Sequence, residues 1–445
     1  MKKLSVGILT GLLSLAASAA QDRYHPEHLF IKMKEGQKLV KSELIQSSKN
    51  IIGSIYLVNT QNLEKLEAEL SQNAEIEYVE KDYYAGKAEM PKLEPLDPIS
   101  FQMKSLMESN FTQFNDPSVN KLWAFSDKGM DVTAAYASLP NRTPKEIIVA
   151  VVDTGVDHKH EDLRDVMWVN DGEIPGNNKD DDGNGYIDDI HGINTLVRDA
   201  NGNATMNTMA SHWHGTHVAG TIAATQNNGI GIAGVANNVK IMAIRTVPDN
   251  ADELDSDIVE GFRYAAKMGA KIINCSFGKK KNEGGMIVRD VINEIGRKYN
   301  VLVIASAGND SMGPWSWANN DTTPKFPASF DSPNLLVVAS TDSGGNLSSF
   351  SNIGPQTVDV AAPGGNIYST INNNKYSSAS GTSMASPNTS GVAAMILGYY
   401  PSLKTTQLKR ILMDSVTKAS PYEGRMTSQG RVNLKRALEN AKRRR

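Results

Sequence analysis

Residues 147–155 read IIVAVVDTG, an apolar run that ends in an aspartate, a threonine and a glycine. A continuous apolar run of this length, without polar alternation, indicates a strand that is buried on both faces. Stretches with helical periodicity separate it from five similar runs, at residues 239–244, 271–275, 301–305, 335–339 and 358–361. The pattern predicts an α/β fold in which helices flank a mostly parallel sheet, with the functional residues at the carboxyl ends of the strands.

Three reactive side chains lie at the ends of predicted elements. Asp153 ends the first strand, His214 opens a helix in HGTHVAG (214–220), and Ser383 lies in GTSMASP (381–387) before an apolar helix. A serine hydroxyl is a poor nucleophile at neutral pH, so an imidazole must take its proton and a carboxylate must orient the imidazole. Each residue alone has a structural explanation, such as a cap or a buried histidine. The three together favour nucleophilic catalysis.

These segments and their order along the chain resemble the subtilisin-like serine proteases, over about residues 116–434. The resemblance implies a serine endopeptidase that cleaves proteins or peptides through an Asp-His-Ser triad and an acyl-enzyme. A fourth segment, VIASAGN (303–309), matches the family strand that ends in the oxyanion-stabilising asparagine. Asn309 is therefore expected to donate its side-chain amide to the oxyanion, together with the backbone N–H of Ser383.

The resemblance also implies a substrate groove. The segment after residue 275 looks like the family strand that pairs with the substrate backbone, and residues 305–308 would form the other wall of the pocket for the residue before the cut. Because backbone pairing is indifferent to side chains, we expect broad cleavage of proteins. The expected groove residues are Ser276, Phe277, Gly278, Ala305, Ser306, Ala307 and Gly308.

Lys325 adds a hypothesis about specificity. It lies near the expected pocket floor, where relatives often carry a small residue. Its ammonium would favour acidic or polar side chains in the pocket. The alternative is a lysine that is simply solvated.

An acidic loop at residues 180–189, DDDGNGYIDD, predicts a calcium site. Its oxygen side chains alternate and a glycine separates them, as in the first half of an EF-hand loop. His191 stands where that motif has its bidentate glutamate, and the alternative is a solvated acidic turn. The expected ligands are Asp180, Asp182, Asn184, the carbonyl of Tyr186, and Asp188 or Asp189.

A second calcium site follows only from the resemblance. Asp116, Asp162 and Asn228 match the strong site of thermitase-like members of the family. An ion bound only by the folded state would stabilise an exported protein that has a single cysteine and can form no internal disulfide.

The N-terminal part of the chain predicts export and a precursor. Residues 1–20 have the charged, apolar and small-residue order of a signal peptide, which implies a secreted or periplasmic protein. Residues 21–84 resemble the inhibitory propeptides of the family, expected to be a small α+β, ferredoxin-like domain. Residues 85–114 are expected to be a linker that holds the maturation bond, 115–441 the peptidase domain, and 442–445 a basic tail.

The amino-acid composition argues against two classes of binding protein. With 46 Lys and Arg against 49 Asp and Glu, the chain has no basic excess for nucleic acid or an anionic membrane. After removal of the signal it is expected to be a monomer without a membrane association. Two rival interpretations remain: a zinc hydrolase built on His212, His214 and His217, and a calcium-dependent binding protein with an inactive protease fold.

Overall fold

The structure, a computed structural model, describes residues 24–84, 91–95, 113–200, 202–249, 253–279, 285–313 and 316–444. The expected signal peptide lies outside these residues. None of the helices in the described ranges has both the length and the apolar character needed to cross a bilayer.

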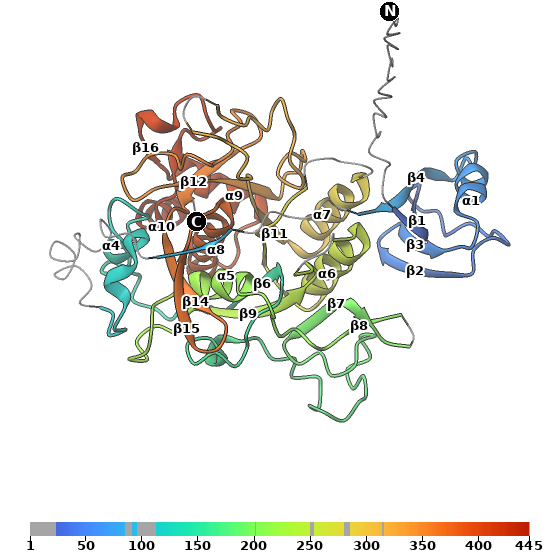
Figure 1. The fold of residues 1–445 in the computed structure, drawn as a ribbon, viewed down its shortest axis with the longest axis horizontal. Helices are drawn as coiled ribbons and strands as arrows, with labels where there is room; N and C mark the ends of the chain where they lie inside the picture. Colours follow the sequence, from blue (N-terminus) through green and yellow to red (C-terminus); the bar gives the residue numbers. More distant parts are fainter. Residues whose placement is uncertain are drawn as a thin grey trace, which may run out of the picture.

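The run that begins at residue 147 forms strand β6 (Ile147–Asp153), inside a ten-stranded sheet. Its neighbours β9 and β10 both run parallel to it, and only the two outermost pairs are antiparallel. The predicted α/β sheet is thus confirmed (Figure 1). In order across the sheet, the strands are β16 (Thr417–Lys418), β17 (Gly430–Arg431), β13 (Val360–Pro363), β12 (Leu335–Thr341), β11 (Leu302–Ser306), β10 (Ile272–Cys275), β6, β9 (Val239–Arg245), β7 (Gly192–Arg198) and β8 (Ala204–Thr205).

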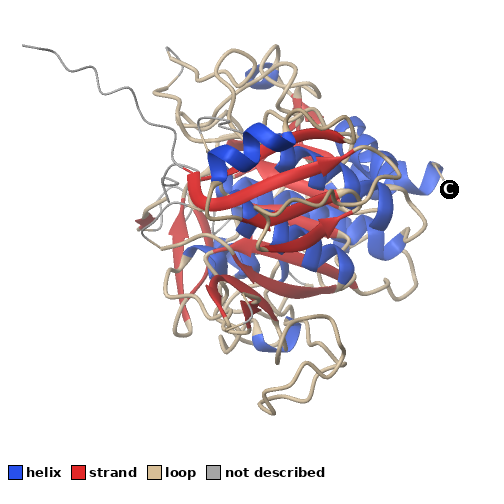
Figure 2. Ribbon diagram, turned by 90° about the vertical axis from the view of Figure 1, so that its right-hand side faces the viewer, coloured by secondary structure: helices blue, strands red, loops and turns tan. Residues whose placement is uncertain are grey.

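The two faces of β6 explain its unbroken apolar sequence. Val149 and Val151 pack into a hydrophobic cluster that includes residues of helices α5 (His214–Ala223) and α8 (Thr382–Tyr399). Ala150 and Val152 pack into a second cluster, with α6 (Asp255–Lys267) and α7 (Met286–Tyr299). Strands and helices are layered in the view of Figure 2. The remaining helical segments are α4 (Val132–Tyr136), α9 (Thr405–Asp414), α10 (Leu434–Arg443), and 3₁₀ turns at Val119–Lys121, Trp123–Phe125, Arg164–Val166 and Ser420–Tyr422.

Residues 24–84 form a separate unit that packs on α6 and α7, to the right in Figure 1. Its antiparallel sheet has the order β2-β3-β1-β4, which is the strand order of a ferredoxin-like sheet. The crossover from the first strand to the second carries no helix, so a single helix covers the sheet. The elements of this unit are β1 (Tyr24–Met33), β2 (Ser47–Ile52), β3 (Ile55–Asn59), α1 (Leu63–Leu70) and β4 (Ile76–Tyr83).

The structure differs from the sequence interpretation in three places. The apolar run at residues 51–58 is divided between β2 and β3 by a turn at Gly53, whose φ is +55°. The expected linker contains a short strand, β5 (Leu93–Glu94), in an antiparallel sheet with β14 (Ile367–Ile371) and β15 (Lys375–Ala379). Lys442 and Arg443 of the expected basic tail lie in the last turn of α10, and Arg444, which follows them, forms an ion pair with Asp414 at 2.6 Å.

Candidate active site

The end of β6 and the start of α5 bring Asp153 and His214 together. The Nδ1 of His214 lies 2.8 Å from Oδ1 of Asp153, and both side chains are buried. Gly215 permits this approach, because a Cβ at that position would lie 2.1 Å from the carbonyl oxygen of Gly155. The backbone N–H of Thr154 also donates to Oδ1 of Asp153, at 2.7 Å. The carboxylate therefore fixes the ring, and Nε2 of His214 is buried with no hydrogen-bond partner among the described residues.

Ser383 lies in the first turn of α8, and α8 packs against α5. Its hydroxyl donates to the carbonyl oxygen of Ser276 at 2.9 Å and makes no hydrogen bond to His214 in this structure. The three side chains predicted from the sequence thus come from elements that meet at the carboxyl edge of the sheet.

A proline inside α8 explains a hydrogen bond between this turn and the residue that follows β10. Pro387 has no N–H, so the carbonyl of Ser383, four residues earlier, has no intrahelical donor. The hydroxyl of Ser276 donates to that carbonyl instead, at 2.9 Å. The backbone of the turn is therefore fixed from outside the helix.

Asn309 faces the start of α8 from the loop after β11. Its Oδ1 accepts hydrogen bonds from the backbone N–H and the hydroxyl of Thr382, at 2.8 and 2.9 Å. These two donors set the orientation of the amide, which leaves Nδ2 as its donor. Nδ2 would lie 3.6 Å from a Cβ on Gly381, two residues before Ser383. An amide donor therefore lies beside the turn that carries the serine.

The expected groove residues follow two adjacent parallel strands. Cys275 of β10 pairs with Ala305 of β11, so residues 276–278 and 306–308 leave the sheet side by side. The loop at residue 308 is fixed by its backbone N–H, which donates to the hydroxyl of Thr382 at 3.1 Å. A Cβ at Gly278 would lie 2.9 Å from the carbonyl of Phe326, so this position has no room for a side chain.

Lys325 is mostly buried and paired, which contradicts the solvated alternative and leaves its effect on specificity as a prediction. Its side chain is 14% exposed, and its Nζ lies 2.9 Å from Oδ2 of Asp310. Its Cγ would be 3.7 Å from a Cβ on Gly278, so the stem runs beside the groove strand. An acidic substrate side chain would have to compete with Asp310 for this ammonium, and no sequence pattern pointed to that partner.

The three histidines of the zinc alternative do not form a metal site within the described ranges. His217 is fully buried, and its Nε2 lies 3.0 Å from the carbonyl oxygen of Ile367. Burial, with a smaller effect of His214, lowers the pKa of His217 to about 3. Within the described ranges, the one group of three residues close enough to hold a metal contains only carboxylates.

That group consists of Glu173, Asp182 and Asp189, whose oxygens lie within 4.8 Å of one another. Glu173 is outside the acidic motif and was missed by the sequence analysis. Asn184 also reaches the group, because its Nδ2 donates to Asp182 at 3.0 Å and to Asp189 at 2.9 Å. Burial raises the pKa of Asp189, with a smaller effect from Asp182. Carboxylate oxygens of this kind suit a hard cation such as calcium.

Two other expected ligands of the loop accept hydrogen bonds from backbone N–H groups. Asp188 accepts from Gly176 and Asn178, at 2.8 and 2.9 Å. Asp180 accepts from backbone N–H groups inside the loop. The structure thus brings together part of the predicted set and adds a member from upstream.

The structure brings together all three residues of the second expected calcium site. Asn228 donates to Asp162 at 2.8 Å, and the backbone N–H of Asn228 donates to Asp116 at 3.2 Å. Burial raises the pKa of Asp162 to about 6, and the nearby charge of Asp116 contributes in the same direction. Two buried carboxylates that repel each other suit a bound cation.

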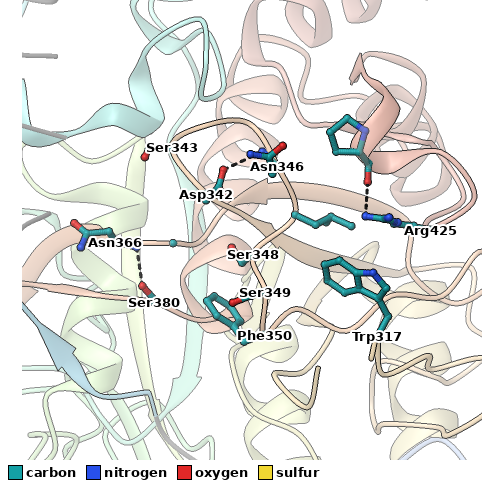
Figure 3. A pocket seen from close by; sticks show the side chains of 13 residues that line it. Trp317, Asp342, Ser343, Asn346, Ser348, Ser349, Phe350, Asn366, Ser380 and Arg425 are labelled. Atoms are coloured by element: carbon teal, nitrogen blue, oxygen red, sulfur yellow. Dashed lines mark hydrogen bonds between the residues drawn. The ribbon is translucent and has the colours of Figure 1, made fainter. Parts of the chain in front are cut away.

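A cavity of about 510 Å³ lies beside the start of α8 (Figure 3). Ser380, three residues before the serine of the site, is on its rim. The other side chains that line it include Trp317, Phe350, Asn366 and Arg425. The cavity is thus a second recess next to the groove.

Comparisons with known proteins agree with this architecture. The family model described as the subtilase family matches residues 144–432. Subtilisin-like protease 1 of Plasmodium berghei (strain Anka) is 32% identical over 340 residues, which cover 74% of this chain and 55% of that protein. This chain thus spans about half of that relative's length.

Two further comparisons cover bacterial proteins. Thermitase of Thermoactinomyces vulgaris is 35% identical over 291 residues, 65% of this chain and 88% of that protein. The crystal structure of fervidolysin from Fervidobacterium pennivorans, described as a keratinolytic enzyme related to subtilisin, superposes with a TM-score of 0.68 and 24% identity, over 94% of this chain and 61% of that chain. The last comparison shows a shared fold. From the family match and these relatives, the chain belongs to the subtilase family of serine peptidases.

Proposed function

We propose that this chain is the precursor of a secreted serine endopeptidase whose triad is Asp153, His214 and Ser383. The observation that carries the proposal is the buried contact of 2.8 Å between Asp153 and His214, with Nε2 of the same ring buried and without a partner in the part of the chain that the structure describes. A neutral histidine oriented in this way can act as a general base towards an adjacent serine hydroxyl.

The reaction follows from these positions. The Ser383 hydroxyl turns from the Ser276 carbonyl towards His214, which takes the proton as Oγ attacks the peptide carbonyl. His214 then returns the proton to the departing amine, which leaves an acyl-enzyme. Water attacks this ester by the same route, so that one peptide bond and one water become a carboxylate and an amine.

Asn309 would stabilise the charge on the carbonyl oxygen. Its oxygen is occupied by Thr382, so its Nδ2 can donate to the oxyanion without reorienting. The backbone N–H of Ser383 is a second donor, because N–H groups in the first turn of a helix have no intrahelical partner. Both donors are in place before charge develops.

Residues 24–84 would act as an inhibitory propeptide. The last strand of this unit places Glu80 at the start of α7, where its carboxylate accepts from the N–H groups of Met286 and Ile287. Asp82 accepts in the same way from Ser256 in the first turn of α6. Negative charge at helix N-termini is favourable. Tyr84 then forms an antiparallel bridge with Leu254, just before α6.

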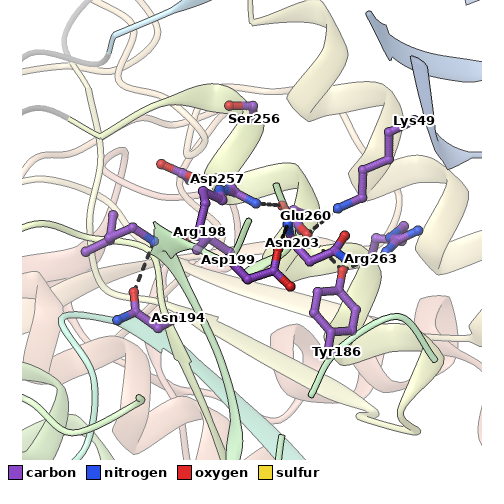
Figure 4. Close-up of polar contacts among 12 residues, drawn as sticks. Lys49, Tyr186, Asn194, Arg198, Asp199, Asn203, Ser256, Asp257, Glu260 and Arg263 are labelled. Carbon is purple, nitrogen blue, oxygen red and sulfur yellow. Dashed lines mark hydrogen bonds and ion pairs between the residues drawn. The ribbon is translucent and has the colours of Figure 1, made fainter. Parts of the chain in front are cut away.

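A polar network adds to this interface (Figure 4). Lys49 of the N-terminal unit lies 2.6 Å from the buried carboxylate of Glu260 in α6. Arg198 of β7 and Tyr186 of the acidic loop contact the same carboxylate. Burial opposes ionisation of Glu260, but Arg198 and Lys49 hold its pKa below the ordinary value. Removal of the unit would take away one of its counter-charges.

Calcium would be the resident ion of both carboxylate groups, and its chemistry would be structural. Glu173, Asp182 and Asp189 would hold one ion, and Asp116 and Asp162 another. Neither group includes a residue of the proposed triad.

The test uses the purified precursor beside its Ser383→Ala form, with Ser138→Ala as a matched control at an exposed serine. We expect self-processing and labelling by a fluorophosphonate in the parent and in the control, and neither in Ser383→Ala. Peptide mapping should place the label on Ser383. Processing of the Ser383→Ala chain by itself would refute the proposed nucleophile.

A further inference from the structure

His212 lies two residues before the histidine of the proposed triad and takes no part in the proposed reaction. The backbone N–H of His214 donates to its Nδ1 at 3.2 Å. His214 is the first residue of α5, where backbone N–H groups have no intrahelical acceptor. The ring of His212 therefore supplies an acceptor that the helix itself lacks at its start.

This hydrogen bond determines where the two rings carry their protons. A backbone N–H can only donate, so Nδ1 of His212 must be unprotonated, and the neutral ring has its hydrogen on Nε2. His214 has the opposite arrangement, because its Nδ1 lies 2.8 Å from the carboxylate of Asp153 and must donate to it. The lone pair on Nε2 of His214 is then available to accept a proton. Two imidazoles whose centroids lie 6.3 Å apart thus hold opposite tautomers.

The segment that carries His212 is fixed by side chains from two directions. Arg245, the last residue of β9, donates to the carbonyl of Met209 at 2.8 Å and to the hydroxyl of Ser211 at 3.2 Å. Asn372, in the turn between β14 and β15, donates to the carbonyl oxygens of the two residues before His212, at 3.1 and 3.3 Å. The backbone position of His212 relative to α5 is therefore set by the fold.

The surroundings of the ring favour its neutral form. Burial lowers the pKa of His212, and the nearby His214 acts in the same direction, whereas Asp153 and Asp249 oppose the shift. Arg245 pairs with Asp249 at 3.5 Å, which reduces the attraction of this carboxylate for an imidazolium. The N-terminus of α5 also disfavours a positive charge. Above pH 6.5 the ring is therefore neutral and accepts from α5, and this contact is lost as the pH falls through the lowered pKa.

We propose that His212 is a positioning residue for the reaction: its neutral ring holds the start of α5, and with it His214, in the reactive position. This rests on the proposed function. Protonation of Nδ1 by solvent removes the acceptor and places a positive charge beside His214, which must itself become positively charged when it takes the proton of Ser383. Acid should therefore lower the rate twice, once through each imidazole.

The experiment measures kcat/KM against pH on a short peptide substrate for the self-processed parent, His212→Asn and His212→Ala. In the parent, the acid limb should steepen from a dependence on one proton to a dependence on two. An asparagine can accept from the N–H two residues later at every pH, so His212→Asn should keep the rate of the parent at pH 8 and depend on one proton throughout. His212→Ala should lower kcat at pH 8 by about threefold to tenfold, the cost of a lost helix cap, with KM unchanged.

The matched control is His191→Asn, the same replacement at a half-buried histidine whose Nδ1 lies 2.8 Å from the carbonyl oxygen of Trp168. Its acid limb should match that of the parent. Three results would overturn the inference: an acid limb in the parent that depends on one proton only, equal losses in His212→Asn and His212→Ala at pH 8, or a change confined to KM, which would make the ring a substrate contact.

A second measurement observes the ring without any turnover. In the precursor with Ser383→Ala, the NMR signal of His212 is identified by its loss when His212→Asn is added, and its titration midpoint should lie below 6.5. A midpoint at or above 6.5 would contradict the inference. If this midpoint is low but the parent takes no fluorophosphonate and cleaves no peptide, it is the proposed function that fails.

Discussion

The catalytic centre and the acidic loop both bury carboxylates, but they stabilise them differently. Asp153 receives donors from the protein itself, the N–H of Thr154 and the ring of His214. Glu173, Asp182 and Asp189 also accept hydrogen bonds from the protein, but their own oxygens lie within 4.8 Å of one another. The first carboxylate faces an imidazole, whereas the second group places like charges together and is expected to need a cation. Substitution of an acid of the first kind should change catalysis or binding. Substitution of an acid of the second kind should change the stability of the folded protein.

The largest effect should come from Asp153→Asn, because an amide cannot accept from both Thr154 and His214 and also stabilise the imidazolium. We expect kcat to fall by about 10⁴-fold while the melting temperature stays close to that of the parent. Steady-state kinetics on a short peptide and thermal unfolding measure the two quantities. Asp165→Asn, at an exposed acid, is the control. A large loss of stability without a loss of kcat would break the distinction between the two regions.

Removal of calcium by a chelator should lower the stability that depends on the second kind of acid. Removal of calcium from a protein saturated to about 100 times its Kd should lower the free energy of unfolding by about 2.7 kcal/mol. The measurement is thermal unfolding of the Ser383→Ala form with and without chelator, which avoids self-digestion.

The matched variants of this experiment are Asp189→Asn and Asp171→Asn. The first should reduce the response to chelator, and the second, an exposed acid two residues before Glu173, should not. A melting temperature indifferent to both chelator and calcium would show that the carboxylate groups hold no ion.

Glu80 belongs to the N-terminal unit, and its carboxylate accepts hydrogen bonds from backbone N–H groups of the peptidase. Burial, and then the charge of Asp255, raises its pKa to about 7, against the opposing effects of Met286, Ile287 and Lys279. A raised pKa means that the bound state favours the protonated acid. Propeptide affinity should therefore be highest near pH 5 and fall as pH rises through 7.

With a pKa of about 7 in the complex and the ordinary value of 4.5 in the free propeptide, the expected fall in affinity between pH 5 and pH 8 is up to about 70-fold. It is measured as inhibition of the mature enzyme by the separately added propeptide, with Glu80→Gln as the variant in which this dependence flattens. A steeper fall in Glu80→Gln than in the parent would assign the pH dependence to another group.

The smallest effect concerns the charge pair beside the groove. Asp310→Asn removes the partner of Lys325, so the ammonium becomes available to a substrate. We expect kcat/KM for cleavage after Glu relative to Phe to rise by about threefold, the size of a partly exposed ion pair. Lys325→Ala in the same background should abolish the rise. Equal cleavage after both residues in every variant would exclude any contribution of this lysine to specificity.

The sequence predicted the sheet, because unbroken apolar strands dictate a buried parallel sheet. The meeting of Asp153 with His214 was expected from the residue types that a serine nucleophile needs and from the resemblance to the subtilisin-like proteases. The sequence could not predict Glu173 as a neighbour of Asp189, since a loop of irregular conformation sets that contact and no periodicity points to it. The pairing of Lys325 with Asp310 is likewise a contact between two loops. Strand β5 was missed because two residues carry no alternation to detect.

Cys275, the single cysteine, lies in β10 between β6 and β11 and has no exposed surface. Burial raises the pKa of its thiol well above the ordinary value, so almost no thiolate is present and reagents cannot reach the sulfur. Alkylation can then occur only when the middle of the sheet opens. The rate at which iodoacetamide modifies the intact protein therefore reports the frequency of that opening, without any introduced probe.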